Sequence, residues 1–274
     1  MKEDKKNADK LSVEEKRKVL DELLGDAKPN PKPKRVRPKA SVGGRVPRQA
    51  VDLGLPSGTL WAPWNVGARG EEDSGAYFAW GEVVASKTRN WESWYGWNNY
   101  KWATRPLDEY DSRENHITKY QVPDGQVDGE WYSCGFFEGD GIRSLMPEDD
   151  AATANWGPKW KMPTREQLAE LQDPELCHWE WEYWNCGFRI TGRNGNSIFL
   201  PAAGFCYEDV CEGDGSMGNY WSSQVYWEDD YISGEGGTTC AFRMNFLRRD
   251  VGETSCGSLR YYGMTVRPVL AERK

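Results

Sequence analysis

The chain has 274 residues, of which 38% are hydrophobic, and it carries a formal net charge of -8. This is enough apolar material for one sizeable domain or two small ones. No run approaches the 18 apolar residues of a membrane helix, and no secretory apolar region follows Met1. We therefore expect neither a membrane span nor a signal peptide, and we expect a cytoplasmic protein.

Charge and aromatic content divide the chain near Ala50. Residues 1–50 hold 15 Lys and Arg against 8 Asp and Glu, and no aromatic residue. The remainder holds 20 basic and 35 acidic residues and all 15 Trp, 13 Tyr and 8 Phe. These counts predict a basic N-terminal region, 1–50, and a folded acidic domain, 51–274.

The basic region begins with a predicted helix. Ser12 as N-cap and Glu15 three residues later form a capping box, and Gly25 stops the helix after Leu24. Its apolar stripe is too narrow to fold alone, so the helix docks on another protein or frays. The Pro-rich, basic stretch 28–47 favours an extended linker. Since no aromatic residue is interleaved for base stacking, a spacer is preferred to a nucleic-acid contact.

The acidic domain opens with short apolar runs broken by Gly and Pro, which predicts short strands and long loops. Seven of its tryptophans fall into two groups, Trp91, Trp94, Trp97 and Trp102, then Trp179, Trp181 and Trp184. A sugar-stacking platform is one interpretation. We favour core filling, because a loop-rich domain needs large rings. One helix is predicted, Thr164 to Leu171, with Thr164 as N-cap and Gln167 at N3.

Two strands are predicted near the C-terminus. In 241–247, Phe242, Met244 and Phe246 alternate with polar residues, so Arg243 and Asn245 should point away from the core. In 262–269, Met264 and Val266 should face inward and Thr265 and Arg267 outward. The segments 228–239 and 252–259 read as surface loops. Short strands presenting irregular loops indicate a binding face.

Metal and redox chemistry find little support in the sequence. The seven cysteines, Cys134, Cys177, Cys186, Cys206, Cys211, Cys240 and Cys256, show no zinc spacing and are expected to be reduced thiols. No metal or cofactor is predicted. Calcium would have to be held by oxygens of Asp149, Asp150, Asp229 and Asp230. We expect Glu148-Asp149-Asp150 to be a solvated loop or helix start and not an acid/base pair.

Six ordered motifs carry a family resemblance: VDLGLPSGTLWAPWNVGA, AYFAWGEV, MPEDDAATANWGPKWKMPTREQLAEL, GNSIFLPAAGF, GNYWSS and YYGMTVRPV. They resemble the Fib-succ major paralogous domain, which is similar to the C-type-lectin-fold variable proteins of diversity-generating retroelements in bacteria and phages. The resemblance spans about Val51 to Val269. It implies an α+β, C-type lectin-like fold, preceded by the basic helix and linker, with a hypervariable ligand-binding face on the C-terminal strands and loops. It also adds a phage particle as a second location.

Adenine mutagenesis in such proteins turns AAY codons into NNY codons, which cannot encode Trp, Gln, Glu, Lys or Met. Seven residues would then be fixed scaffold: Trp221, Gln224, Trp227, Glu228, Glu235, Met244 and Glu253. Ten other residues can be encoded by NNY codons and are called reachable below: Asp229, Asp230, Tyr231, Arg243, Asn245, Arg248, Asp250, Thr254, Cys256 and Ser258.

These patterns predict a ligand-binding protein and not an enzyme. Aromatic anchors, an arginine and adaptable polar groups are the chemistry of a protein-recognising surface, so an unknown macromolecular partner, protein rather than glycan, is expected. The predicted contact residues are Tyr226, Asp229, Asp230, Tyr231, Arg243, Asn245, Arg248, Asp250, Thr254, Ser258 and Tyr261. Two alternatives are kept. WKMPTREQLAEL resembles a helix of formylglycine-generating enzymes, which are oxidoreductases, and a calcium-independent carbohydrate-binding module would use the tryptophans.

Overall fold

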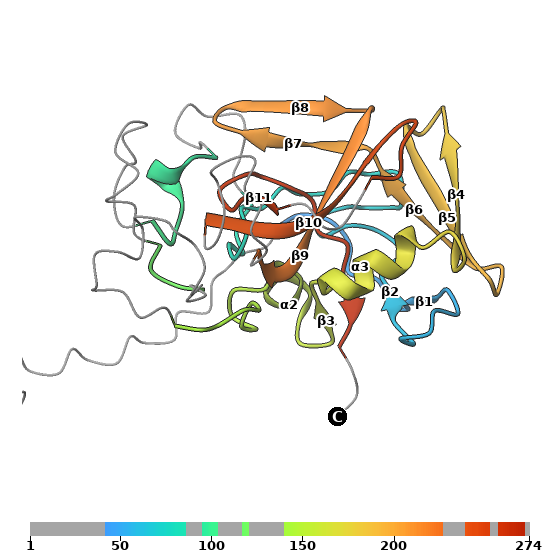
Figure 1. Cartoon of the computed structure of the whole chain (residues 1–274), viewed down its shortest axis with the longest axis horizontal. Coiled ribbons are helices and arrows are strands. Elements are labelled where there is room, and N and C mark those ends of the chain that lie inside the picture. The colour runs from blue at the N-terminus through green and yellow to red at the C-terminus, as the bar shows by residue number, and fades with distance from the viewer. Residues whose placement is uncertain are drawn as a thin grey trace, which may run out of the picture. The chain divides into compact units, whose positions relative to one another are not determined.

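The computed structural model describes residues 42–85, 95–103, 117–120, 140–226, 239–252 and 257–271. The chain divides into two compact units, Met1–Lys39 and Ala40–Lys274. The predicted N-terminal helix and most of the predicted linker lie outside the described residues. All the elements described below belong to the second unit (Figure 1).

Three sheets of short strands form this unit. The four-stranded sheet runs in the order β1 (Val51–Asp52), β2 (Leu60–Trp61), β12 (Val269–Leu270), β3 (Trp160–Lys161). The five-stranded sheet runs β11 (Gly257–Leu259), β10 (Cys240–Leu247), β9 (Met217–Val225), β7 (Ala203–Tyr207), β8 (Val210–Asp214). The three-stranded sheet is β4 (Cys177–Glu182), β5 (Gly187–Gly192), β6 (Ser197–Pro201). With few helices beside them, these strands confirm the predicted α+β class with short strands.

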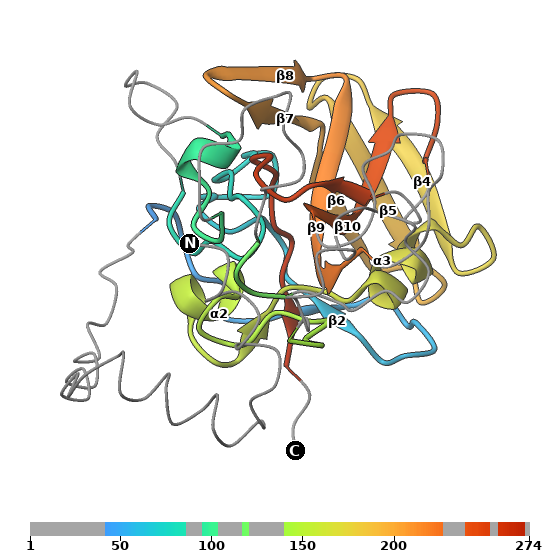
Figure 2. The ribbon, with the colours of Figure 1, turned by 60° about the vertical axis from the view of Figure 1, so that its left-hand side comes forward.

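Helix α3 (Arg165–Gln172) confirms the helix predicted from its cap. Thr164 accepts the backbone N–H of Gln167, and the Gln167 side chain accepts the backbone N–H of Thr164, so the capping box is complete. Leu168 and Leu171 are buried, as expected. In Figure 2 the helix lies close to one end of β9 and β10, which it contacts. The sequence therefore specified this element locally.

Two shorter helices were not predicted, α2 (Ala151–Trp156) and the 3-10 turn η3 (Trp97–Asn99). Asp150 caps α2 by accepting the N–H of Thr153 at 2.9 Å, so the acidic run is a helix start, one of the two expected readings. Asp149 and Asp150 are nevertheless buried, which corrects the expectation of a solvated loop. The helix has only six residues, too few to show an apolar period.

The pair β9–β10 separates two hydrophobic clusters. Met244 and its cross-strand partner Tyr220 belong to one cluster, together with Phe246. Trp221, the next residue on β9 and the cross-strand partner of Arg243, belongs to the other cluster, together with Met264 and Val266. Because neighbouring residues of a strand point to opposite faces, the two clusters lie on opposite sides of this pair. Most of β9 is buried on both faces.

The predicted strand 262–269 is regular only at its end, where β12 begins after Pro268. Met264 and Thr265 form single bridges with Phe78 and Tyr220. Thr265 and Arg267 are fully buried, so the prediction that they point outward is wrong. The physical reason is hydrogen bonding: the Arg267 guanidinium donates to Asn65 Oδ1 at 2.8 Å and to two backbone carbonyls. Burial lowers the pKa of Arg267 to about 10.

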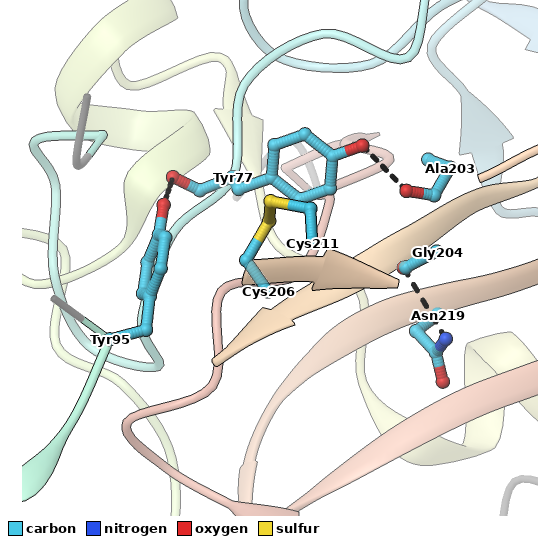
Figure 3. Close-up of a disulfide and its surroundings, with 7 residues drawn as sticks. All are labelled: Tyr77, Tyr95, Ala203, Gly204, Cys206, Cys211 and Asn219. Atoms are coloured by element: carbon cyan, nitrogen blue, oxygen red, sulfur yellow. Dashed lines mark hydrogen bonds between the residues drawn. A yellow bond between two sulfur atoms is a disulfide. The ribbon is translucent and has the colours of Figure 1, made fainter. Parts of the chain in front are cut away.

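The expectation that all cysteines are reduced is also wrong. Cys206 and Cys211 form a disulfide across the β7–β8 hairpin, with Cα atoms 4.0 Å apart (Figure 3). On the disulfide side of the hairpin, the Tyr77 hydroxyl donates to the Ala203 carbonyl and the Tyr95 hydroxyl donates to the Tyr77 carbonyl. Cys177 and Cys186 are free thiols, and Cys240 is buried beside the Thr239 hydroxyl. Cys134 and Cys256 lie outside the described residues.

Residues 42–50 pack on the acidic domain, although the predicted boundary was Val51. The Arg45 N–H donates to the Ala68 carbonyl at 2.8 Å, and Trp64 Nε1 donates to the Arg45 carbonyl at 2.6 Å. Val42 packs against the cluster that contains Trp221, and Pro47 is buried. This segment is therefore part of the compact unit that begins at Ala40.

A truncation series tests this boundary. We expect a chain that begins at Ala40 to keep the melting temperature of the full chain. A chain that begins at Val51 should lose about 1–3 kcal/mol of unfolding free energy, because the two hydrogen bonds of Arg45 and the Val42 contact disappear. Urea unfolding of both truncations measures the difference. Equal stability of the two would show that residues 42–50 contribute nothing to the fold.

Candidate ligand-binding face

The predicted binding face starts from the alternation along β10. Phe242, Met244 and Phe246 are fully buried, which confirms the inward positions, whereas Arg243 and Asn245 are partly exposed. A register shift between Ala241 and Arg243 interrupts the pairing with β9. It coincides with a change of cluster, since Phe242 packs with Tyr226 and Cys240 and not with Met244. The strand thus offers a rigid frame with one partly open side.

The Arg243 side chain, on β10, forms hydrogen bonds with residues of both neighbouring strands. Its Nε donates to the Ser258 hydroxyl on β11, and its Nη1 donates to Asn219 Oδ1 on β9 at 2.8 Å. Asn219 in turn donates through Nδ2 to the Gly204 carbonyl of β7 at 3.3 Å. The expected outward-pointing arginine is therefore a half-buried, oriented guanidinium. Such a group meets a ligand with little further loss of conformational freedom.

Hydrogen bonds from helix α3 hold the turn after β10. Gln172 Nε2 donates to the Val251 carbonyl at 2.7 Å and to the Asn245 carbonyl at 3.3 Å. Gly252 closes the turn with φ 67°, and a Cβ there would lie 2.3 Å from the Asn245 carbonyl oxygen. Asp250, exposed in this turn, exchanges backbone hydrogen bonds with Leu247. The exposed side chains of the turn thus stand on a fixed backbone.

A second group of side chains joins the face at this end, which we call the Trp184 cluster: Tyr183, Trp184, Leu247 and Arg248. Trp184 is 98% exposed, Tyr183 67% and Leu247 46%. Arg248 Cζ lies 4.6 Å from the centre of the Tyr183 ring, and the Arg248 N–H donates to the Ser216 carbonyl. Two distant parts of the chain, the β4–β5 turn and the end of β10, therefore meet here.

Sequence reasoning found Arg248 and Asp250 but missed Tyr183, Trp184 and Leu247. It assigned all the tryptophans to core filling, and Trp179 and Trp181 do pack against the cluster that contains Phe246. Trp184 differs because it occupies the turn between two strands, where a side chain has no facing neighbour. The run Tyr183-Trp184-Asn185 between two alternating segments was the available signal. Trp91 and Trp94 lie outside the described residues.

The remaining predicted contact residues are distributed differently. Tyr226 and Ser258 are buried, so they support the face from within instead of presenting a side chain to solvent. The Tyr226 ring packs edge-on against Phe242, with centroids 4.8 Å apart. Tyr261 is partly exposed and lies between Trp97 and Tyr262. Asp229, Asp230, Tyr231 and Thr254 lie outside the described residues.

The buried carboxylates of Asp149 and Asp150 stabilise another part of the domain through hydrogen bonds. Burial raises the pKa of Asp149, but hydrogen bonds from Lys101, Lys119 and Tyr120 outweigh it and lower the pKa below its usual value. Burial raises the pKa of Asp150 to about 6 against the opposing backbone hydrogen bonds from Thr153 and Met162. Both carboxylates are thus fully engaged by protein donors.

Among the described residues there is no group of three or more His, Cys, Asp or Glu that could hold a metal ion. No helix in the described part of the chain is long and apolar enough to cross a membrane. Comparison of the chain with models of protein families, with curated proteins and with solved structures found no match. The family resemblance carried by the sequence motifs therefore stays a prediction.

Proposed function

We propose that this chain is a ligand-binding protein of C-type lectin-like fold that recognises a protein partner through its C-terminal face. The observation that carries the proposal is the Trp184 cluster at the end of β10, the strand on which Arg243 is held by hydrogen bonds to its neighbours. Trp, Tyr and Arg are the residue types that dominate binding energy at protein interfaces. Here Arg243 is held on β10, Arg248 follows that strand, and Tyr183 and Trp184 lie in the turn between β4 and β5.

We propose further that a retroelement diversifies this face. Two described residues that NNY codons cannot encode, Trp221 and Met244, are fully buried. Gln224, the third, accepts the backbone N–H of Arg165 at 2.6 Å and so joins β9 to α3. The reachable residues Arg248 and Asp250 are exposed. Arg243 and Asn245 are partly exposed and Ser258 is buried, so most of the reachable residues that the structure describes lie at the surface, which supports the proposal.

One observation favours the carbohydrate-binding alternative. The Trp184 ring is almost completely exposed, and an open indole face can stack on the apolar face of a sugar. The neighbouring Arg248 and Leu247 fit a protein surface better than a single sugar ring. For the oxidoreductase alternative, the candidate Cys240 is buried, and Cys256 lies outside the described residues. A cytoplasmic location stays a prediction, and the Cys206–Cys211 disulfide argues for an oxidising compartment.

The test is a capture experiment followed by affinity measurements. Immobilised full-length chain is exposed to bacterial and phage lysates and, separately, to a glycan array. With the partner so identified, Trp184→Ala should weaken binding at least about 30-fold, the effect of a hot-spot residue, and Arg248→Ala about 5- to 10-fold. Melting temperatures should not change.

Val84→Ala and Arg69→Ala serve as matched controls, because each removes an exposed apolar or cationic side chain elsewhere on the domain. They should bind like the natural chain. If the Trp184 and Arg248 variants also bind unchanged, the partner uses another surface and the proposal is wrong. Binding to glycans alone would support the carbohydrate module instead.

A further inference from the structure

In the part of the chain that the structure describes, the five-stranded sheet ends in an unpaired edge at β8. Within the described residues, β8 pairs with β7 alone and stands last in the strand order. It is the outermost strand of the sheet in Figure 1, and most of its residues are exposed. An edge strand of this kind offers backbone donors and acceptors to another chain.

The pairing register shows which groups are offered. The Cys206 N–H donates to the Gly263 carbonyl, and the Cys206 carbonyl accepts the Gly263 N–H, each at 2.8 Å. Cys206 and Cys211 are therefore a non-hydrogen-bonded pair of the hairpin, and the N–H and carbonyl of Cys211 point away from β7. The disulfide between the two residues fixes the hairpin, so the edge is preorganised.

One face of the hairpin combines aromatic rings with carboxylates. Since Tyr207 pairs with Val210 and Phe205 with Glu212, these side chains share the face opposite the disulfide. We call this surface the aromatic–acidic face; it consists of Phe205, Tyr207, Val210, Glu212, Asp214 and Tyr262. The Phe205 and Tyr207 rings are stacked with centroids 5.8 Å apart, and Tyr262 packs against both. Val210 is 42% exposed.

The charged side chains of the β7–β8 hairpin and of the strand after it are all negative. Residues 203–224 contain four carboxylates, Glu208, Asp209, Glu212 and Asp214, all exposed, and no Lys or Arg. The Glu212 carboxylate accepts the Tyr207 hydroxyl at 2.9 Å, so it lies at the hydroxyl end of the Tyr207 ring. Aromatic faces and carboxylates both attract ammonium and guanidinium groups. Pairing of β8 with β8 of a second copy would bring these carboxylates together and is disfavoured.

We propose that the β8 edge binds a protein partner by strand addition, taking an extended segment with Lys or Arg at every second position. The backbone of the segment pairs with the outward groups of Cys211. Its cationic side chains lie on the aromatic–acidic face, beside Glu212 and the Tyr207 ring. The site contains no residue of the Trp184 cluster, although Ser216, two residues after β8, accepts the Arg248 N–H. The proposal does not depend on the function proposed for that cluster.

Synthetic peptides test the proposal on the full chain. A labelled eight-residue peptide of alternating Lys and Val should bind in a fluorescence anisotropy titration, and hydrogen exchange should show protection of the Cys211 amide. A Glu-Val peptide should not bind. A Lys-Val peptide N-methylated at alternate residues keeps the charge but cannot pair, and it should bind at least about tenfold more weakly.

Charge reversal on the protein gives the second arm. Glu212→Lys combined with Asp214→Lys should weaken Lys-Val binding about tenfold, through lost attraction and new repulsion. Glu180→Lys is the matched control, an exposed acid on β4 at the edge of the three-stranded sheet, and should change affinity less than about twofold. Equal binding of the N-methylated peptide, or equal loss with Glu180→Lys, would reduce the interaction to nonspecific charge attraction and overturn the proposal. No binding of the Lys-Val peptide would also overturn it.

Discussion

Replacement of Arg267 by Ala should lower the free energy of unfolding by about 3–5 kcal/mol. The side chain is completely buried and donates to Asn65 Oδ1, the Ala62 carbonyl and the Phe199 carbonyl. Truncation leaves these acceptors without donors and opens a cavity at the junction of three segments. Chemical denaturation followed by tryptophan fluorescence measures the loss.

Two further variants separate the causes of that loss. Arg267→Lys keeps the charge but gathers its donors at one nitrogen, which cannot reach three separated acceptors, so it should recover less than half of the stability. Arg69→Ala removes an exposed arginine and should stay within about 0.5 kcal/mol of the natural chain. A loss below about 1 kcal/mol for Arg267→Ala would mean that the guanidinium is solvated and that the assigned hydrogen bonds do not exist.

Arg267 also shows why part of this fold could not be read from the sequence. Its alternation with Val266 predicted an exposed position, because period-two patterning assumes that polar side chains face water. Its partner Asn65 is 202 residues away in the chain. Nothing local records such a partner, and the same holds for Asp149, whose donors Lys101 and Lys119 come from other segments.

Elements specified by neighbouring residues were predicted well. The cap of α3 needs only Thr164 and Gln167, which are three residues apart. The inward side chains of β10 follow from alternation within a single strand. The site was predicted only in part, because some of its residues come from segments that are distant in the sequence. Arg248 and Asp250 belong to one turn, whereas Tyr183 and Trp184 reach the same end of the domain from the β4–β5 turn, and their arrival depends on how two sheets are packed.

Met244 and Arg243 are neighbours on β10, and their replacement should separate loss of fold from loss of recognition. Met244 is fully buried against Phe246 and its β9 partner Tyr220. Met244→Ala should therefore cost about 2–5 kcal/mol of unfolding free energy, the usual range for truncating a buried Met. Binding should fail only in proportion to the unfolded fraction, so the affinity of the remaining folded molecules is unchanged.

Arg243→Ala should behave in the opposite way. Because Arg243 donates to Ser258 and Asn219, its replacement should cost about 1–2 kcal/mol, more than an exposed residue would, yet leave the domain folded. Recognition of the captured partner should fall by about tenfold or more in molecules that remain fully folded, since an oriented arginine is lost from the face. Both variants are compared at a temperature where circular dichroism shows them folded. If folded Met244→Ala loses affinity as strongly as Arg243→Ala does, or if Arg243→Ala binds like the natural chain, then Arg243 serves only the sheet and the partner contacts a different part of the domain.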